Sequence, residues 1–292
     1  MAVYIHTGVD AQTRKYALLG ARLPYTLSPQ IQNTLFAARG ANALYVPLCV
    51  PAASLASAVD VLRHDFAGFN VTVPYKEAVV PFLDELDAAA SACGAVNTVT
   101  VGEDGALTGH ITDGLGMMRA LEEAWVELCG IDALIVGGGG TARVAAYELL
   151  RRESRVTLAV RTPHKAHALR DDLAALQDDG DARIRILPLD ALAEAGEAYD
   201  LLVHCTPLGT FPETDACAVP VPVIGRCRAV FDAVYNPPES LLLSRARQAG
   251  VKCVNGFGML FYQAVEAQRL WLGGAPPTRV LREARRALEA LV

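Results

Sequence analysis

Three polar side chains interrupt an apolar segment near residue 70, where a buried strand would carry mainly apolar residues. The sequence GFNVTVPYK, residues 68–76, contains Asn70, Thr72 and Lys76. Because side chains alternate along a strand, Asn70 and Thr72 share one face, and Pro74 ends the strand before Lys76 begins a helix. An amide, a hydroxyl and an ammonium placed in this way can converge on one small ligand.

Lys76 has the chemistry of a general acid. When a ketone is reduced, the oxygen becomes an alkoxide, which a partly desolvated lysine beside a carboxylate can protonate and stabilise. Asp113, in the sequence TDG before a helical pattern, is the candidate carboxylate. Both residues also have ordinary interpretations, because Asp is a common N-cap and Lys76 could be a surface residue in a first helical turn.

A glycine-rich segment, ALIVGGGGTARV, follows an apolar run and precedes a helical pattern. Gly137-x-Gly139-x-x-Ala142 is the spacing of the dinucleotide fingerprint, in which glycine permits a sharp turn and close approach of the backbone to a pyrophosphate. The free N–H groups of the following helix would then face the phosphate charge. The expected cofactor-binding residues here are Gly137, Gly138, Gly139, Gly140 and Thr141. A tight strand-to-helix turn without a ligand would look the same.

The end of the next expected strand distinguishes the two nicotinamide cofactors. An NAD site would carry Asp or Glu there for the ribose hydroxyls, but the chain has Arg161, Thr162 and, one turn later, Lys165. An arginine can bind a 2′-phosphate through two hydrogen bonds, whereas a carboxylate would repel it. These residues favour NADP and argue against an S-adenosylmethionine enzyme, although Arg161 could also be a solvated residue at a strand end.

Length and composition indicate a globular protein with substantial cores. The chain has 292 residues, of which 52% are hydrophobic and 20% charged, enough for one large domain or two of ordinary size. The net charge is −6 without a basic run, so we expect no nucleic acid partner. Seven cysteines without a C-x-x-C pair are typical of reduced thiols, which predicts a cytoplasmic protein.

The sequence lacks the features of membrane-associated proteins and of metal-binding proteins. The N-terminal sequence has no basic and then apolar leader, and no later run reaches the ~18 apolar residues of a membrane span. We therefore expect no membrane association. His164 and His167 could pair on a helix but have no further spaced ligands, so we infer no metal.

Strand-like runs alternate with helix-like segments in two series, which predicts an α/β fold with parallel strands and two domains. In the first series, YALLG, ALYVPL and FNVTVP each precede a helical pattern, the last over 76–91. A hairpin with an Asp-Gly turn is expected over 94–111, then a helix from Asp113 to about Cys129. Further expected strands are 131–136, 155–160, 183–187, 199–205 and 228–232, and two amphipathic segments follow at 256–272 and 276–291. The Pro-rich loop 206–227 is long for a connector, which indicates a functional role.

The motifs of the chain resemble those of the shikimate dehydrogenase family over nearly its whole length. In chain order they are GARLPYTLSPQIQN, FNVTVPYK, GAVNT, GHITDG, GGGGTAR, VRT, CTPLG, DAVYNPPES and GFGMLFYQA. Their common order makes the resemblance specific. It implies NADP-dependent interconversion of 3-dehydroshikimate and shikimate, with hydride transfer between nicotinamide and ring C3.

The resemblance also implies two domains and a set of site residues. A substrate domain with a mixed, mostly parallel sheet would cover 1–113 and be completed by the C-terminal helices 256–292. A Rossmann-type NADP-binding domain would cover 114–255. Lys76 and Asp113 would form the acid–base pair. The implied substrate contacts are Thr26, Ser28, Asn70, Thr72, Asn97, Tyr235 and Gln263, and Ala233 and Gly256 would lie near the nicotinamide. Ser28 could instead cap a helix, Asn97 could lie in a turn, and Gln263 could be a polar helix residue.

Four positions depart from the family pattern. They are Thr26, Ile111, Val160 and Leu272. The extra methyl at Thr26 would change the shape around the substrate carboxylate and C1, where quinate carries an additional hydroxyl. These departures leave a quinate/shikimate dehydrogenase, or a paralogue acting on an aminated ring such as aminoshikimate, as alternatives.

A third alternative is a non-catalytic NADP-binding regulatory protein. The joint presence of Lys76, Asp113, Asn97 and Gln263 argues against it, because a sensor needs no acid and no hydroxyl-binding set. We expect the ligand to be a hydroxylated cyclohexene carboxylate and the protein to be a monomer or homodimer.

Overall fold

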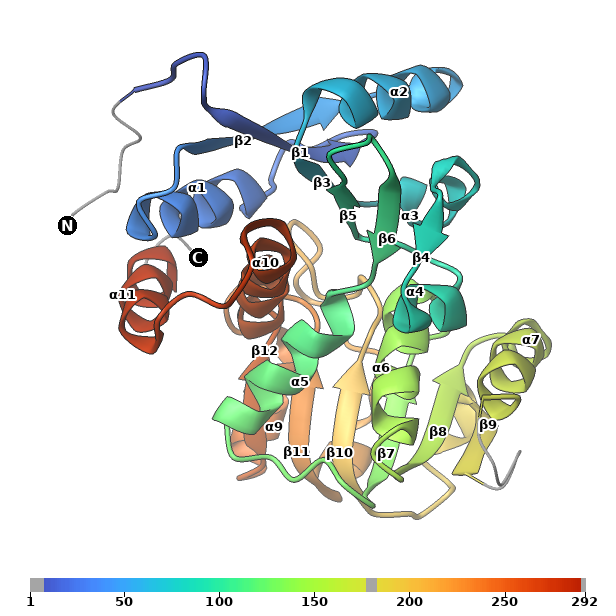
Figure 1. The fold of residues 1–292 in the computed structure, drawn as a ribbon. Helices are drawn as coiled ribbons and strands as arrows, with labels where there is room; N and C mark the ends of the chain where they lie inside the picture. The colour runs from blue at the N-terminus through green and yellow to red at the C-terminus, as the bar shows by residue number, and fades with distance from the viewer. Residues whose placement is uncertain (1–7, 177–182, 290–292) are drawn as a thin grey trace. The chain divides into compact units, whose positions relative to one another are not determined.

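The computed structural model describes residues 8–176 and 183–289, and the chain in it divides into two compact units. One unit comprises the chain up to Thr112 and from Gln263 onward, and the other comprises Asp113–Tyr262. Each is built on its own six-stranded sheet with helices packed against it (Figure 1). The predicted α/β class with mostly parallel sheets is confirmed.

The sheet of the first unit is mixed. Its strands are β1 (Arg14–Gly20), β2 (Ala43–Cys49), β3 (Gly68–Val71), β4 (Glu85–Leu86), β5 (Thr98–Val101) and β6 (Leu107–His110), in the order β2-β1-β3-β5-β6-β4. β5 runs antiparallel to both β3 and β6, whereas the other neighbouring pairs are parallel. The hairpin expected over 94–111 is therefore confirmed as β5 and β6.

Helices cover both faces of this sheet. The helices are α1 (Ser28–Ala38), α2 (Leu55–Asp65), α3 (Tyr75–Ala78), α4 (Ala88–Cys93) and α11 (Thr278–Glu289), with short 3-10 turns η1 (Ala52–Ser54) and η2 (Val80–Phe82). Helix α10 (Phe257–Leu272) provides Trp271, which packs with Tyr16 and Leu18 of β1. Ala17 and Leu19 point to the other face and pack with α2. The alternation of β1 therefore builds two cores, one on each face.

The prediction of a single helix over 76–91 is wrong. The chain instead forms α3, η2, β4 and α4. Pro81 lies in η2 and has no backbone N–H to donate, and Leu83 after it is extended at ψ 148°. Asp87 then starts a new helix, because its carboxylate accepts the backbone N–H of Ala90 at 2.7 Å. The end of the segment predicted at 276–291 lies outside the described residues.

The sheet of the second unit is entirely parallel. Its strands are β7 (Asp132–Val136), β8 (Arg155–Val160), β9 (Ile184–Pro188), β10 (Tyr199–His204), β11 (Cys227–Asp232) and β12 (Lys252–Asn255), in the order β12-β11-β10-β7-β8-β9. The first five confirm the predicted strands to within a residue, and β12 was not predicted. The order reverses direction between β7 and β10, and open parallel sheets bind ligands at such a switch point, beyond the carboxyl ends of the strands.

Helices lie on both faces of this sheet. They are α5 (Asp113–Glu123), α6 (Gly140–Leu150), α7 (Pro163–Ala174), α8 (Val221–Ile224) and α9 (Leu241–Gln248), with a 3-10 turn η4 at Leu189–Leu192. Helices α5 and α6 pack side by side on one face (Figure 1). Leu134, Val136 and Leu202 point to the other face and pack against α8 and α9. Across the parts of the chain that the structure describes, no helix is long and apolar enough to span a membrane.

Helix α5 is shorter than expected and ends at Glu123 rather than near Cys129. Trp125 follows with a left-handed backbone at φ 57°. The Nζ of Lys252 donates to the carbonyl oxygens of Ala124 and Trp125 at 3.0 and 2.9 Å. The ammonium satisfies carbonyl groups at the helix end that would otherwise lack partners.

Candidate functional site

A cavity of about 580 Å³ lies within the second unit, beyond the carboxyl ends of β7, β8 and β10. Its volume is in the range typical of small-molecule and cofactor sites. Six predicted cofactor residues line it: Gly137, Gly138, Gly139, Arg161, Thr162 and Lys165. The structure thus brings the glycine turn and the basic strand end together at the switch point of the sheet.

Gly137 is required by the local backbone. Its φ is +128°, and a Cβ there would lie 3.1 Å from the carbonyl oxygen of Cys205, so a larger residue would be strained. At Gly139 a Cβ would meet no atom within 4 Å. The space over Gly139 is therefore open to a ligand. Gly140 and Thr141 follow in the first turn of α6 and do not belong to the described lining of the cavity.

The cavity wall carries only positive formal charge. Arg161 and Lys165 are exposed, and the described residues that line the cavity include no Asp or Glu. The end of β8 therefore offers cations to a phosphate and no acceptor for ribose hydroxyls, which fits NADP better than NAD. Nearby Arg143 is paired with Asp172 at 2.8 Å.

One wall of the cavity was not assigned from the sequence. Cys205, Thr206, Pro207 and Leu208 follow β10 and face the glycine turn. Burial raises the pKa of the Cys205 thiol, and the Asp232 carboxylate adds to the rise, so Cys205 remains a thiol at neutral pH. The sequence did mark this segment, through the CTPLG motif and the long Pro-rich loop, but gave no role to its individual residues.

Ala233 and Gly256 contact one another through the backbone. A Cβ at Gly256 would overlap the Ala233 carbonyl group, and the Gly256 amide donates to the carbonyl oxygen of Val234 at 3.2 Å. Neither residue belongs to the described lining of the cavity. Tyr235 follows on the same segment, and burial raises the pKa of its phenol, so the hydroxyl keeps its proton at neutral pH.

In the first unit, Asn70 lies at the centre of a buried hydrogen-bond network. Its Oδ1 accepts from the Tyr45 hydroxyl at 2.8 Å and from Gln32 Nε2 at 3.4 Å. Its Nδ2 donates to the carbonyl oxygen of Asn97 at 3.0 Å and to the Thr98 hydroxyl at 2.9 Å. All four hydrogen-bonding positions of this carboxamide are used within the protein.

Asn97 lies immediately before β5 and is 3% exposed. Its carboxamide binds Thr98 and Thr112. Among the residues that the structure describes, the Nδ2 group has one hydrogen-bond partner, the Thr112 hydroxyl at 3.1 Å. An amide nitrogen has two hydrogens, so Asn97 retains a donor that a ligand could use.

Thr72 and Lys76 follow β3 around the turn that contains Pro74. The Thr72 amide donates to the carbonyl oxygen of Leu19 at 2.9 Å, which continues the parallel pairing beyond the end of the strand. Lys76 is half-buried in the first turn of α3. Its carbonyl oxygen accepts from the Val96 amide at 2.8 Å. This bond ties α3 to the segment that carries Asn97.

The other predicted residues lie at element ends or on helices. Ser28 begins α1, and its amide donates to the Thr26 hydroxyl at 3.2 Å. Gln263 is buried on α10 at 7% exposure. Asp113 is the first residue of α5 and of the second unit.

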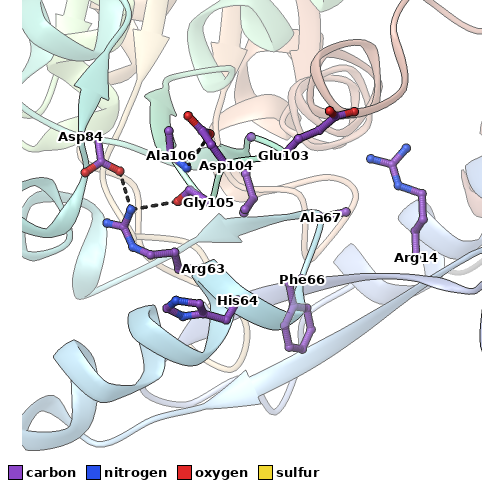
Figure 2. A pocket seen from close by; sticks show the side chains of 12 residues that line it. Arg14, Arg63, His64, Phe66, Ala67, Asp84, Glu103, Asp104, Gly105 and Ala106 are labelled. Atoms are coloured by element: carbon purple, nitrogen blue, oxygen red, sulfur yellow. Dashed lines mark hydrogen bonds and ion pairs between the residues drawn. The ribbon is translucent and has the colours of Figure 1, made fainter.

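A second cavity, of about 660 Å³, lies in the first unit beside the turn of the β5–β6 hairpin (Figure 2). Arg63 is held there by hydrogen bonds, since it donates to Asp84 at 2.6 Å and to the carbonyl oxygen of Gly105 at 2.9 Å. Glu103 and Asp104 add negative charge to the same wall. Among the residues that the structure describes, none of the predicted site residues lines this cavity.

Comparison with known proteins identifies the family. Residues 18–99 match the shikimate dehydrogenase substrate binding domain. A shikimate dehydrogenase (NADP(+)) of Rubrobacter xylanophilus is 45% identical over 279 residues, which cover 94% of this chain and 96% of that protein. A crystal structure of a shikimate dehydrogenase in complex with NADP+ aligns with a TM-score of 0.88 at 33% identity, covering 96% of this chain and 97% of the other. A quinate dehydrogenase from Corynebacterium glutamicum in complex with NAD aligns with a TM-score of 0.84 at 31% identity, covering 94% and 99% of the two chains. The chain belongs to the shikimate dehydrogenase family.

Proposed function

We propose that the protein is an NADP-dependent shikimate dehydrogenase, which interconverts 3-dehydroshikimate and shikimate. The observation that carries this proposal is the cavity of the second unit, where Gly137–Gly139 lie beside Arg161 and Lys165 without a described acidic residue in the lining. The relatives named above as NADP-dependent shikimate dehydrogenases support the same substrate and cofactor.

The proposed cofactor site uses the backbone and the cations of this cavity. Gly137–Gly139 would approach the pyrophosphate, with Gly140 and Thr141 supplying backbone N–H groups from the start of α6. Arg161, Thr162 and Lys165 would hold the 2′-phosphate. Ala233 and Gly256 would border the nicotinamide, where a residue larger than glycine at 256 would overlap the Ala233 carbonyl group. NADP, when bound, supplies or accepts the hydride at ring C3 of the substrate.

In the proposed chemistry Lys76 and Asp113 form the acid–base pair. During ketone reduction the Lys76 ammonium would donate a proton to the developing alkoxide and stabilise its charge until the proton has moved. In the reverse direction the amine would accept the proton of the hydroxyl. The Asp113 carboxylate would hold the ammonium in place and favour its charged form.

The remaining predicted residues would orient the ring. Thr26 and Ser28 are proposed to bind the substrate carboxylate, and Asn97, Thr72, Tyr235 and Gln263 are proposed to bind ring hydroxyls or the ring itself. Asn97 suits this role because it retains a free amide donor. For Asn70 we propose a supporting role in place of the direct contact predicted from the sequence, since its hydrogen-bonding positions are used by Tyr45, Gln32, Asn97 and Thr98.

We also propose that residues 1–113 with 256–292 form the substrate domain and that 114–255 form the NADP-binding domain. The free state of all seven cysteines fits a reducing compartment, and we propose that the protein acts in the cytoplasm as a monomer or homodimer.

Quinate/shikimate dehydrogenase activity is the second candidate function. Thr26, which departs from the family pattern, and the similarity to a quinate dehydrogenase favour it. An extra methyl beside C1 would change how well the additional hydroxyl of quinate is accommodated.

Steady-state kinetics test these proposals directly. We expect NADPH oxidation with 3-dehydroshikimate and NADP+ reduction with shikimate, each with a higher kcat/KM than with NADH or NAD. A higher kcat/KM for quinate than for shikimate would favour the second candidate. NADPH binding without turnover of any of these ring acids would overturn the enzymatic proposal in favour of a regulatory protein.

A further inference from the structure

A buried chain of hydrogen bonds runs from α9 to the cofactor cavity of the second unit. The Ser240 hydroxyl donates to Asp232 Oδ2 at 2.5 Å, and Asp232 Oδ1 lies 2.9 Å from His204 Nδ1. His204 Nε2 lies 2.5 Å from the hydroxyl of Thr206. Ser240 and His204 are 1% exposed and Asp232 is 0% exposed, but Thr206 lines the cavity.

The order of donors along this chain follows from its chemistry. An ionised carboxylate only accepts hydrogen bonds, so His204 carries a proton on Nδ1 and donates it to Asp232. In the neutral imidazole Nε2 is then an acceptor, and Thr206 must donate its single hydroxyl proton to it. The Thr206 oxygen in turn accepts from the Leu208 amide at 3.4 Å.

The same carboxylate also organises the neighbouring segment. Asp232 Oδ1 accepts from the Val234 amide at 3.0 Å, and the Ala233 amide donates to the carbonyl oxygen of His204 at 3.0 Å. This series of hydrogen bonds therefore fixes both the wall formed by Cys205–Leu208 and the segment that carries Ala233. Burying a carboxylate and an imidazole would be costly unless each had these partners.

We propose that His204 is a positioning residue for cofactor binding, which acts through Thr206 by directing the threonine hydroxyl proton away from the cavity. Thr206 then presents an oxygen lone pair to the ligand. Its partner is a hydrogen-bond donor of the cofactor, a ribose hydroxyl or the carboxamide N–H of nicotinamide, and not a phosphate oxygen. This inference rests on the proposed assignment of the cavity to NADP.

A double-mutant cycle tests the link between the two residues. Thr206→Val removes the hydroxyl and nearly keeps the shape, whereas Thr206→Ser keeps the hydroxyl. His204→Asn places an amide nitrogen near the Nδ1 position, which keeps a donor for Asp232 but leaves Thr206 without its acceptor. The Kd of NADPH, the KM of NADPH and kcat are measured for these variants and for the double variant, with Arg228→Ala on the exposed start of β11 as control.

We expect Thr206→Val and His204→Asn each to raise the Kd and KM of NADPH by roughly fivefold to tenfold, the effect of one hydrogen bond, with kcat within threefold of wild type. Thr206→Ser should bind NADPH nearly as the wild type does. The double variant should be no weaker than either single variant, because both remove the same interaction. Additive losses in the double variant, or a His204→Asn protein that loses thermal stability while its NADPH Kd is unchanged, would overturn the inference.

Two further results separate this inference from the proposed function. If wild-type protein fails to bind NADPH, the cofactor assignment itself is wrong and the inference falls with it. If NADPH binds and Arg161→Ala weakens it, but Thr206→Val does not, only the role of His204 and Thr206 is refuted. Should His204→Asn fail to fold, the comparison of Thr206→Val with Thr206→Ser still decides the matter, since equal NADPH Kd values for both would overturn the inference.

Discussion

Asn97 and Thr112 are hydrogen-bonded to each other across the open end of the β5–β6 hairpin. The backbone amide of Thr112 donates to Asn97 Oδ1 at 2.7 Å, and Asn97 Nδ2 donates to the Thr112 hydroxyl at 3.1 Å. Thr112 immediately precedes Asp113, the proposed carboxylate of the acid–base pair.

Thr112→Val should lower the free energy of unfolding by about 1 kcal/mol, because it removes hydroxyl hydrogen bonds that are fully buried. Urea unfolding measures this change. Thr108→Val on the same hairpin is the matched control, since the Thr108 side chain makes no hydrogen bond to any residue that the structure describes. Equal effects of the two changes would contradict a specific role for the Asn97–Thr112 pair.

Lys76→Ala should lower kcat by a factor of about 10² to 10⁴, the usual contribution of a general acid. The Kd of NADPH should stay within twofold of wild type, because the proposed cofactor contacts lie on other residues. Glu77→Ala, on the exposed side of the same helix α3, is the control. Unchanged turnover in the Lys76 variant would remove this residue from the chemistry.

Arg161→Ala should weaken NADPH binding by about tenfold to a hundredfold, the magnitude of a charge-assisted hydrogen bond. NADH lacks the 2′-phosphate and should lose far less affinity. Fluorescence titration with both cofactors measures the difference, and Arg228→Ala serves as a surface control. Equal losses of affinity for NADPH and NADH would show that Arg161 does not bind the 2′-phosphate.

Gly139→Ala and Gly256→Ala should have different effects, the first on NADPH affinity and the second on stability. A Cβ at Gly139 meets no protein atom within 4 Å, so the variant should keep its stability. It should lose NADPH affinity, because the methyl group would occupy space that the ligand needs. A Cβ at Gly256 would overlap the Ala233 carbonyl group and should cost about 1–3 kcal/mol of stability. Thermal melts together with NADPH titrations distinguish the two, and full NADPH affinity in Gly139→Ala would place the pyrophosphate elsewhere.

Asp87 should make stability depend on acid pH. Burial by itself raises the pKa of this carboxyl, but hydrogen bonds from His110 and from the Ala90 amide lower it below its usual value of 3.8. A lowered folded-state pKa stabilises the protein above the unfolded value, and the stabilisation is lost as the pH falls through the folded value. The stability difference between wild type and Asp87→Asn should therefore shrink from pH 5 to pH 3 in urea unfolding experiments. A difference that is constant with pH would show that the charge of Asp87 contributes nothing.

The parallel sheet of the second unit could be predicted because its strands are buried on both faces. The run ALIV is continuously apolar, and RVTLAV is apolar apart from Arg155 and Thr157, which is typical of strands covered by helices on both sides. The strand β12, KCVN, is short and lies at the edge of the sheet, so it lacks this pattern. The helix over 76–91 was predicted wrongly because apolar spacing was given more weight than Pro81 and the capping residue Asp87.

The cofactor residues that could be predicted are those close together in the sequence. Gly137–Gly139 form one turn, and Arg161 follows the next strand along the chain. Thr206 could not be assigned because it reaches the same cavity from β10, which pairs with β7 only after the chain has crossed over the sheet. The use of the Asn70 carboxamide within the protein also depends on distant residues, from Gln32 to Thr98.

The hairpin of β5 and β6 places its turn and the residues that precede Asp113 at opposite ends of its two strands. Thr98 pairs with His110 at one end, and Val101 pairs with Leu107 at the other. The turn at Gly102–Ala106 is thus remote, along both strands, from the residues that precede Asp113. Evolution could lengthen or shorten that turn, and a spectroscopic label could be inserted there, without altering how the chain enters α5.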